Sequence, residues 1–197
     1  FGTIRLLKNL MGLWLFQETK RLLGDEKGFA DLIKEASVSE PFKLFVNPND
    51  QRFFNPVNMI NEIKSYCAET GQNIPQTPGE VCRCIFDSLA FQYRQVLEEL
   101  RDVQDIPINA IHIVGGGCQN ELLNQLCADV TGVAVFAGPV EATAWGNLMF
   151  QNISLGNIGT LEEGREIVKN SFDIREYLPN KIPELESKWQ FFQGLVY

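Results

Sequence analysis

The 197 residues include 45% hydrophobic and 21% charged residues, and 17 Lys and Arg stand against 25 Asp and Glu, for a net charge of −8. This length and composition suffice to bury a hydrophobic core, which excludes an intrinsically disordered protein. The acidic balance also argues against nucleic-acid binding, because neutralising a phosphate backbone requires clustered Lys and Arg.

The sequence predicts neither a membrane protein nor a secreted one. No apolar run approaches the ~20 residues that cross a bilayer. The first residues, "FGTIRLLKNL", lack a signal peptide's long apolar core and cleavage site, and there is no initiator Met, so we expect a piece of a longer protein. Five cysteines without the spacing of a disulfide framework predict a reducing, cytoplasmic setting, although the sequence leaves a Cys67–Cys84 bridge open. With only one His, we expect no protein-bound zinc.

The N-terminal part predicts two helices and a loop. Residues 4–23 carry apolar side chains nearly all round and precede Gly24, so we predict a largely buried helix that ends there. Residues 25–36 predict a shorter amphipathic helix. The stretch 39–56 is rich in proline and asparagine and predicts a loop, with one short extended piece at 43–46.

Two further helices are predicted before residue 104. Pro56 near a first helical position and Gly71 after the last turn predict one of them. Thr77 as N-cap, Pro78 at the first position and Glu80 three residues after the cap form a capping box. Apolar residues at helical spacing follow this box, so we predict a long amphipathic helix of about six turns.

The pattern then alternates between strands and helices. Residues 110–117 predict a short buried strand that stops at glycine, 118–132 a helix, 133–138 a second strand and 139–156 a helix opened by Pro139. This order predicts a βαβ unit with two parallel strands, and hence a helix-rich α/β protein.

Beyond this unit, we expect two more helices. Thr160 is the predicted N-cap of the first, and Pro183 opens the second.

The most distinctive local motif is the triple glycine, Gly115–Gly117. It lacks the Lys-Ser/Thr pair of a phosphate-binding P-loop and the spacing of a dinucleotide fingerprint. Two interpretations remain open from local chemistry. The glycines let a flat ligand lie on the backbone where a parallel strand ends, or they only permit a tight turn and close packing.

Titratable residues do not form a recognisable catalytic motif. His112 lies inside a predicted strand and is interpreted as structural. Asp50, Asp87 and Asp129 are likewise interpreted as polar residues of a loop and of helices, and no nucleophile elbow is present. We therefore expect no catalytic residue within this chain.

Asn9 and Gln17 are uncharged polar residues within the predicted first helix, ~12 Å apart along its axis. This span suits contact with a small substrate at one residue and a cosubstrate at the other. The alternative is that backbone groups nearby satisfy both amides.

Five segments together resemble the C-terminal part of the FGGY carbohydrate kinases, from about Leu6 to Tyr177. They read "LKNLMGLWLFQE", "NPVNMINEIKSYCAETGQ", "RCIFDSLAFQYRQVLEEL", "IHIVGGGCQNELLNQLCADVTG" and "GPVEATAWGNLMFQ". The forms "KNLMGLW" and "GGGCQN" are similar to those of the branch that acts on L-rhamnulose.

The resemblance implies an actin-like ATPase, ribonuclease-H-like domain and the transfer of phosphate from ATP, with Mg²⁺, to L-rhamnulose, giving L-rhamnulose 1-phosphate. It implies nucleotide contacts at Gly116, aided by Gly115, Gly117 and Asn120, and at Gln17, and a sugar contact at Asn9.

The resemblance also implies that residues 1–197 are the nucleotide-side portion of the C-terminal kinase domain. The N-terminal sugar domain and the catalytic aspartate are expected upstream of Phe1, so the chain is expected to be inactive alone. Two alternatives remain: a non-catalytic actin-like nucleotide-binding or interaction module, and an FGGY kinase for another sugar.

Overall fold

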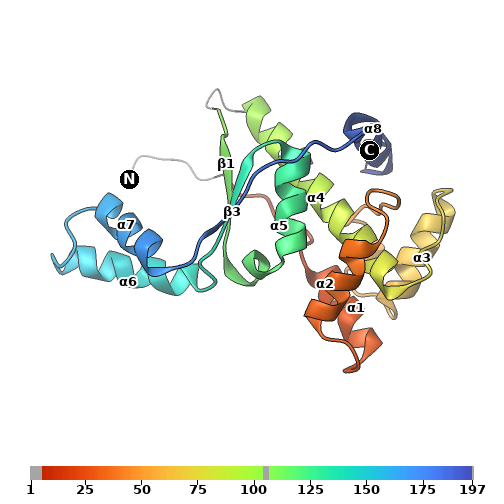
Figure 1. Ribbon diagram of the computed structural model, residues 1–197, viewed down its shortest axis with the longest axis horizontal. Coiled ribbons are helices and arrows are strands. Elements are labelled where there is room, and N and C mark those ends of the chain that lie inside the picture. Colours follow the sequence, from red (N-terminus) through yellow and green to blue (C-terminus); the bar gives the residue numbers. More distant parts are fainter. Residues whose placement is uncertain (1–5, 104–106, 197) are drawn as a thin grey trace. The chain divides into compact units, whose positions relative to one another are not determined.

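The computed structural model describes residues 6–103 and 107–196 (Figure 1). They form two compact units: the first contains the residues up to 92 together with those from 186 onward, and the second contains residues 93–185. Helix α4 (Pro78–Val103) contributes residues to both. None of the helices within the described ranges is long and apolar enough to cross a lipid bilayer.

The first unit is helical and has an aromatic core. Phe91 of α4 lies at the centre of this core. The centroid of its ring lies 5.2 Å from that of Phe45 and 5.5 Å from those of Phe42 and Phe192. These rings join the loop after α2 and the C-terminal helix to α4. Besides part of α4, the unit contains α1 (Trp14–Leu23), α2 (Phe29–Val38), the 3₁₀ helix η1 (Gln51–Phe53), α3 (Met59–Glu69) and α8 (Leu185–Val196).

Buried polar groups fasten the loop after α2 to α4. The Asp87 carboxylate accepts hydrogen bonds from the Phe42 backbone N–H at 2.5 Å and from Arg83 Nε at 2.8 Å. Ser88 Oγ accepts one from the Val46 N–H at 2.9 Å. Burial raises the pKa of Asp87 to about 7, against the lowering effect of Arg83.

The long helix α4 differs from the predicted amphipathic helix in one respect. Its residues 81–92 are all buried, so this part of the helix has no solvent-exposed polar face.

The first helix is shorter than predicted. It begins at Trp14 instead of residue 4 and ends before Gly24 as expected. Gly12 lies within the predicted helix, where glycine is less favourable than alanine by ~1 kcal/mol in the free energy of helix formation. Two hydrogen bonds connect the start of α1 to residues after α2. The Met11 N–H, before the helix, donates to Asn49 Oδ1, and the side chain of Trp14, the first helical residue, donates through Nε1 to the Phe53 carbonyl, both at 3.1 Å.

The capping signals predicted three helix boundaries correctly. Thr77 Oγ1 accepts from the Glu80 N–H at 3.2 Å, and Glu80 Oε2 accepts from the Thr77 N–H at 3.1 Å, as a capping box requires. Gly132 ends a helix with φ +70°, in the left-handed region that glycine favours. Thr160 Oγ1 accepts from the Glu163 N–H at 3.1 Å.

Of the four helix starts predicted from prolines, only Pro78 was correct, and α8 begins at Leu185 instead of Pro183. The starts of α3 and α6 were also wrong. Asn58 caps α3 through its side chain, which accepts from the Asn61 N–H at 3.0 Å, so Pro56 lies outside the helix. Helix α6 begins at Ala142, because the Pro139 carbonyl instead accepts a hydrogen bond from Gly115. The side-chain cap of Asn58 therefore determines where α3 begins, and the contact between Gly115 and Pro139 keeps Pro139 in the loop before α6.

The second unit contains a three-stranded sheet in the order β1–β2–β3. The predicted parallel pairing of β1 and β2 is confirmed, with His112 beside Phe136. The antiparallel strand β3, which pairs Glu176 with Phe136, was not predicted. The elements are β1 (Ala110–Ile113), the 3₁₀ helix η2 (Gly115–Gln119), α5 (Glu121–Thr131), β2 (Ala134–Ala137), α6 (Ala142–Ser154), α7 (Leu161–Ser171) and β3 (Arg175–Tyr177).

The two faces of this sheet differ. On one face α5 packs against the strands through a core of Cys127, Ala128 and Val135 (Figure 1). The flanking Ile111, Ile113, Tyr93 and Tyr177 pack against the same core. The other face carries the alternate residues of the three strands, because successive side chains of a strand point to opposite faces.

Candidate functional site

The loops that follow β1 and β2 meet at the carboxyl end of the sheet. Gly138 N–H donates to the Ile113 carbonyl at 2.8 Å, and Gly115 N–H donates to the Pro139 carbonyl at 3.3 Å. Ligands of open α/β folds bind outside this end of the parallel strands. The triple glycine therefore lies where the fold class places a ligand.

The structure assigns different requirements to two of the glycines. Gly115 has φ +75°, a backbone conformation that side-chain-bearing residues rarely adopt, so the turn itself requires glycine there. Gly116 is exposed, is not in the left-handed region, and would meet no heavy atom within 4 Å if it carried a Cβ. Open space above an unstrained glycine fits an approaching ligand better than a packing constraint.

Two buried asparagines connect the turn to α5. Asn120 Oδ1 caps α5 by accepting the Leu123 N–H at 3.1 Å, and the Asn120 N–H donates to the Gly117 carbonyl at 3.2 Å. Asn124 Nδ2 donates to the Cys118 carbonyl at 2.9 Å. The remaining amide atoms, Asn120 Nδ2 and Asn124 Oδ1, are buried without a hydrogen-bond partner among the described residues. Asn120 thus has a structural role in capping α5.

Asn9 and Gln17 lie in the first unit, whereas Gly115–Gly117 and Asn120 lie together in the second. Both amide side chains are exposed. Gln17 is in the first turn of α1, but Asn9 precedes the helix, so the prediction that one helix axis spaces them by ~12 Å was wrong. Exposure also removes the alternative of two buried amides that backbone groups satisfy.

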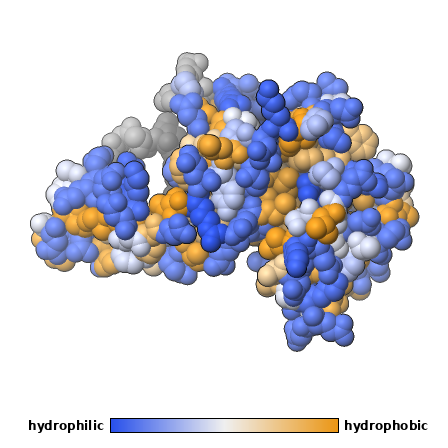
Figure 2. Space-filling view, viewed as in Figure 1, coloured by the Kyte–Doolittle hydropathy of each residue, from blue (hydrophilic) through white to orange (hydrophobic). Residues whose placement is uncertain are grey.

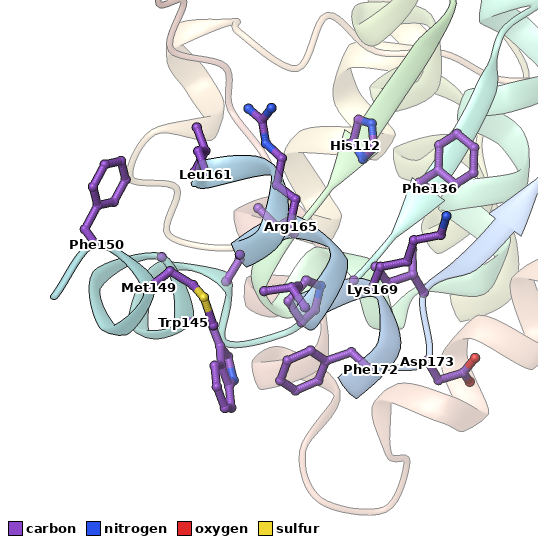
Figure 3. A pocket seen from close by; sticks show the side chains of 18 of the residues that line it. His112, Phe136, Trp145, Met149, Phe150, Leu161, Arg165, Lys169, Phe172 and Asp173 are labelled. Carbon is purple, nitrogen blue, oxygen red and sulfur yellow. The ribbon is translucent and has the colours of Figure 1, made fainter. Parts of the chain in front are cut away.

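A cavity of about 1070 Å³ lies between the second face of the sheet and the pair α6–α7 (Figure 3). His112 and Phe136 come from the strands, Trp145 and Phe150 from α6, and Arg165 from α7. The His112 and Phe136 rings stack with centroids 5.3 Å apart. This cavity was not predicted from the sequence, in which the apolar run "AWGNLMF" of α6 was the available signal.

The acidic residues considered for catalysis all have structural partners. Asp50 caps η1 by accepting the Arg52 N–H at 3.0 Å. Asp129 Oδ1 accepts from Gln125 Nε2 at 2.7 Å and from the Asn180 N–H at 2.8 Å. Asp87 is buried in the ion pair described above. The structural interpretation made from the sequence fits all three.

The cysteines are free and buried. Cys67 and Cys84 are both free, so they do not form the disulfide that the sequence left open. Burial raises the pKa of Cys82 and of Cys127 to about 12. These two thiols therefore stay protonated at neutral pH and act as apolar core residues.

Residues 1–155 match the C-terminal domain of the FGGY family of carbohydrate kinases. The rhamnulokinase of Bacillus subtilis is 48% identical over 92% of this chain, and that of Pectobacterium carotovorum is 45% identical over 98%. The chain spans only 37% and 39% of the length of these relatives.

Solved structures agree on the fold. The xylulose kinase of Rhodospirillum rubrum superimposes on 92% of the chain with a TM-score of 0.63 and 19% identity, covering 36% of that protein. The gluconate kinase of Lactobacillus acidophilus gives a TM-score of 0.61 over 93% of the chain, at 15% identity, and again covers 36%. The chain therefore has part of the actin-like ATPase fold of sugar kinases.

Proposed function

The chain belongs to the FGGY family of carbohydrate kinases, and we propose that the full-length polypeptide phosphorylates L-rhamnulose with ATP to give L-rhamnulose 1-phosphate. The observation that carries this proposal is the close similarity to rhamnulokinases over nearly the whole chain. The unpaired thiols support a cytoplasmic setting.

Residues 1–197 would be the nucleotide-side portion of the C-terminal kinase domain. Gly116 would contact the adenine nucleotide through its exposed backbone, and Gly115 and Gly117 would shape the turn beneath it. Asn120 would act at the same turn, where its Nδ2 has no partner among the described residues. The open space above Gly116 is the geometric support for this assignment.

The exposed amides of the first unit would complete the assignment. Gln17 would contact the nucleotide and Asn9 the sugar. Hydrogen bonds from Met11 and Trp14 to the loop at 49–53 support a defined position for the segment that carries Asn9. An amide both donates and accepts hydrogen bonds, which suits the hydroxyl groups of a ketose.

Proton transfer would depend on an aspartate outside this chain. In phosphoryl transfer a positioned carboxylate accepts the proton of the attacking hydroxyl. Asp50, Asp87 and Asp129 are each engaged in the hydrogen bonds given above, so none is positioned as that base. The contribution of this chain would be to bind and orient the nucleotide.

The residues described do not form a metal site of their own. No group of three or more His, Cys, Asp or Glu side chains lies together within 6–103 and 107–196. Mg²⁺ is commonly held by one or two carboxylates together with substrate phosphates. We therefore propose that Mg²⁺ would enter with ATP.

A direct assay tests the proposed activity. The full-length polypeptide, supplied with ATP and Mg²⁺, is offered L-rhamnulose, D-xylulose and D-gluconate separately, and ADP release is followed while NMR identifies the phosphorylated carbon. We expect turnover with L-rhamnulose and a 1-phosphate product. Preference for another sugar would replace the substrate assignment, and no ADP release with any sugar would favour the non-catalytic nucleotide-binding module.

A further inference from the structure

The turn between β1 and α5 carries three successive glycines, so its backbone needs to be held by other residues. Glycine loses more conformational freedom on ordering than any other residue. A backbone that is ordered only when a ligand arrives binds that ligand more weakly. At the two ends of the glycine run, the Gly115 N–H donates to the Pro139 carbonyl at 3.3 Å and the Gly117 carbonyl accepts from the Asn120 N–H at 3.2 Å.

A third hydrogen bond holds the turn from inside α5. Asn124 lies one helical turn after Asn120, and its side-chain Nδ2 donates to the Cys118 carbonyl at 2.9 Å. The backbone N–H of Asn124 already donates to the Asn120 carbonyl at 3.0 Å, so the helix does not need the side chain in order to start. The Asn124 amide instead connects the helix to the turn that precedes it.

Asn124 departs from the amphipathic pattern of α5. Glu121, Gln125 and Asp129 follow one another at intervals of four residues and are at least partly exposed, and Figure 2 shows hydrophilic surface over this helix. Asn124 is instead fully buried, as is the neighbouring Leu123. Burying a polar side chain costs free energy unless it is hydrogen-bonded. The bond to the Cys118 carbonyl is therefore the contact that an asparagine at this position provides.

The stability of α5 does not account for this asparagine. Its Oδ1 atom is buried without a hydrogen-bond partner among the described residues, and an unpaired buried acceptor lowers stability. Asparagine is also a poorer helix former than leucine, which has a similar branched shape. Leucine would lack only the donor to the Cys118 carbonyl, so the turn is the feature that requires Asn124.

We propose that Asn124 is a positioning residue for the adenine nucleotide. Because it is fully buried, it acts through the Cys118 carbonyl, which lies two residues after Gly116, and not by touching the nucleotide. The inference rests on the proposed function, in which Gly116 contacts the nucleotide. Without the amide, the glycine run is less ordered in the free protein, and binding has to order it.

Nucleotide binding by the full-length polypeptide tests this role. Asn124→Leu keeps the branched shape and removes the donor. We expect the Kd for ADP, measured by calorimetry, to rise about tenfold, and amide hydrogen exchange at residues 115–119 to become faster. The KM for ATP should rise by a similar factor, while kcat and the KM for L-rhamnulose stay within about twofold. A loss of folded protein would instead lower the apparent kcat and leave the KM for ATP unchanged.

Thr131→Val is the matched control. Thr131 Oγ1 donates to the Cys127 carbonyl at 2.6 Å, so this variant also removes a buried bond from a side chain to the backbone of α5, at the other end of the helix. Its Kd for ADP should be unchanged. Asn124→Asp replaces the donor with an acceptor and should weaken ADP binding as Asn124→Leu does. It provides a second variant if circular dichroism shows that Asn124→Leu does not fold.

Several outcomes would overturn the positioning role. They are an unchanged Kd for ADP in a folded variant, unchanged exchange at 115–119, an equal loss of ADP affinity in Thr131→Val, and failure of both Asn124 variants to fold, which would assign the residue to stability. ADP binding is read without phosphoryl transfer, so an unsubstituted protein that binds ADP but does not phosphorylate L-rhamnulose would count only against the proposed function. An unsubstituted protein that does not bind ADP would overturn both.

Discussion

At the scale of single residues, one motif combines two physical requirements. Gly115 is required by backbone conformation, with φ +75°, whereas Gly116 is unstrained and a Cβ placed there would have no heavy atom within 4 Å. Local sequence chemistry left a turn and a ligand surface equally favoured. The structure supports the turn at Gly115 and is compatible with a ligand at Gly116.

Alanine at these two positions should separate the requirements. Gly115→Ala forces alanine into the left-handed region and should lower the free energy of unfolding by about 1 kcal/mol. Gly116→Ala should change it by less than ~0.5 kcal/mol, since no strain and no clash result. Urea unfolding of both variants measures the difference, and equal destabilisation would contradict the assignment of strain to Gly115 alone.

Asp87 should make stability depend on pH. Burial raises its pKa from 3.8 to about 7, so the native state holds a proton that the unfolded state releases near pH 4. The contribution of Asp87 is therefore fully present below about pH 4 and is lost as pH rises through about 7. Against Asp87→Asn, the free energy of unfolding should fall between these values by up to ~1.4 kcal/mol per pH unit.

Urea titrations at pH 4.5, 5.5 and 6.5 give the free energy of unfolding against pH for the unsubstituted protein and for Asp87→Asn. Because other carboxylates titrate in both proteins, the difference between the curves isolates Asp87. Parallel curves would show that Arg83 and the Phe42 N–H hold the carboxylate ionised throughout.

At the scale of elements, the sequence predicted those helix ends that are determined by capping residues within one turn of the end. The Thr77 box, the Thr160 cap and the left-handed Gly132 follow from side-chain and backbone preferences within one turn. The predicted start of α1 was wrong, because Gly12 disfavours a helix and the Met11 N–H donates to Asn49 Oδ1, a partner distant in the sequence. Strand β3 was missed because its three residues acquire their conformation by pairing with β2.

The cap of α4 should contribute measurably to stability. Thr77→Ala removes the acceptor of the Glu80 N–H, and we expect a loss of about 1 kcal/mol in the free energy of unfolding. Thr77→Ser keeps the hydroxyl and is the matched control. If Ala and Ser unfold at the same urea concentration, the capping box does not stabilise α4.

At the scale of the whole molecule, the chain matches the C-terminal domain of its family and spans 37% and 39% of the length of the two relatives given above. The candidate nucleotide contacts fall in both compact units, and Asp50, Asp87 and Asp129 are engaged in structural hydrogen bonds. The resemblance seen in the sequence identified the family correctly, which composition and local motifs did not. Periodicity could not reveal the uncovered face of the sheet, because strand periodicity marks which residues share a face and not which helices pack against it.

Activity should therefore require more than these residues. With ATP, Mg²⁺ and L-rhamnulose, this chain alone should release no ADP above the enzyme-free rate, whereas the full-length polypeptide should turn over. Turnover by this chain alone would show that a catalytic base lies within it and would contradict the assignment of the base to an upstream aspartate.

The central claim, that this chain supplies the nucleotide side of a sugar kinase, is tested most directly by steady-state kinetics of Gly116→Val in the full-length enzyme. Gly194→Val is the control, since Gly194 also has no neighbour within 4 Å and lies in α8. We expect Gly116→Val to raise the KM for ATP roughly tenfold, equivalent to ~1.4 kcal/mol of lost binding, and to leave the KM for L-rhamnulose unchanged. An unchanged KM for ATP would contradict it.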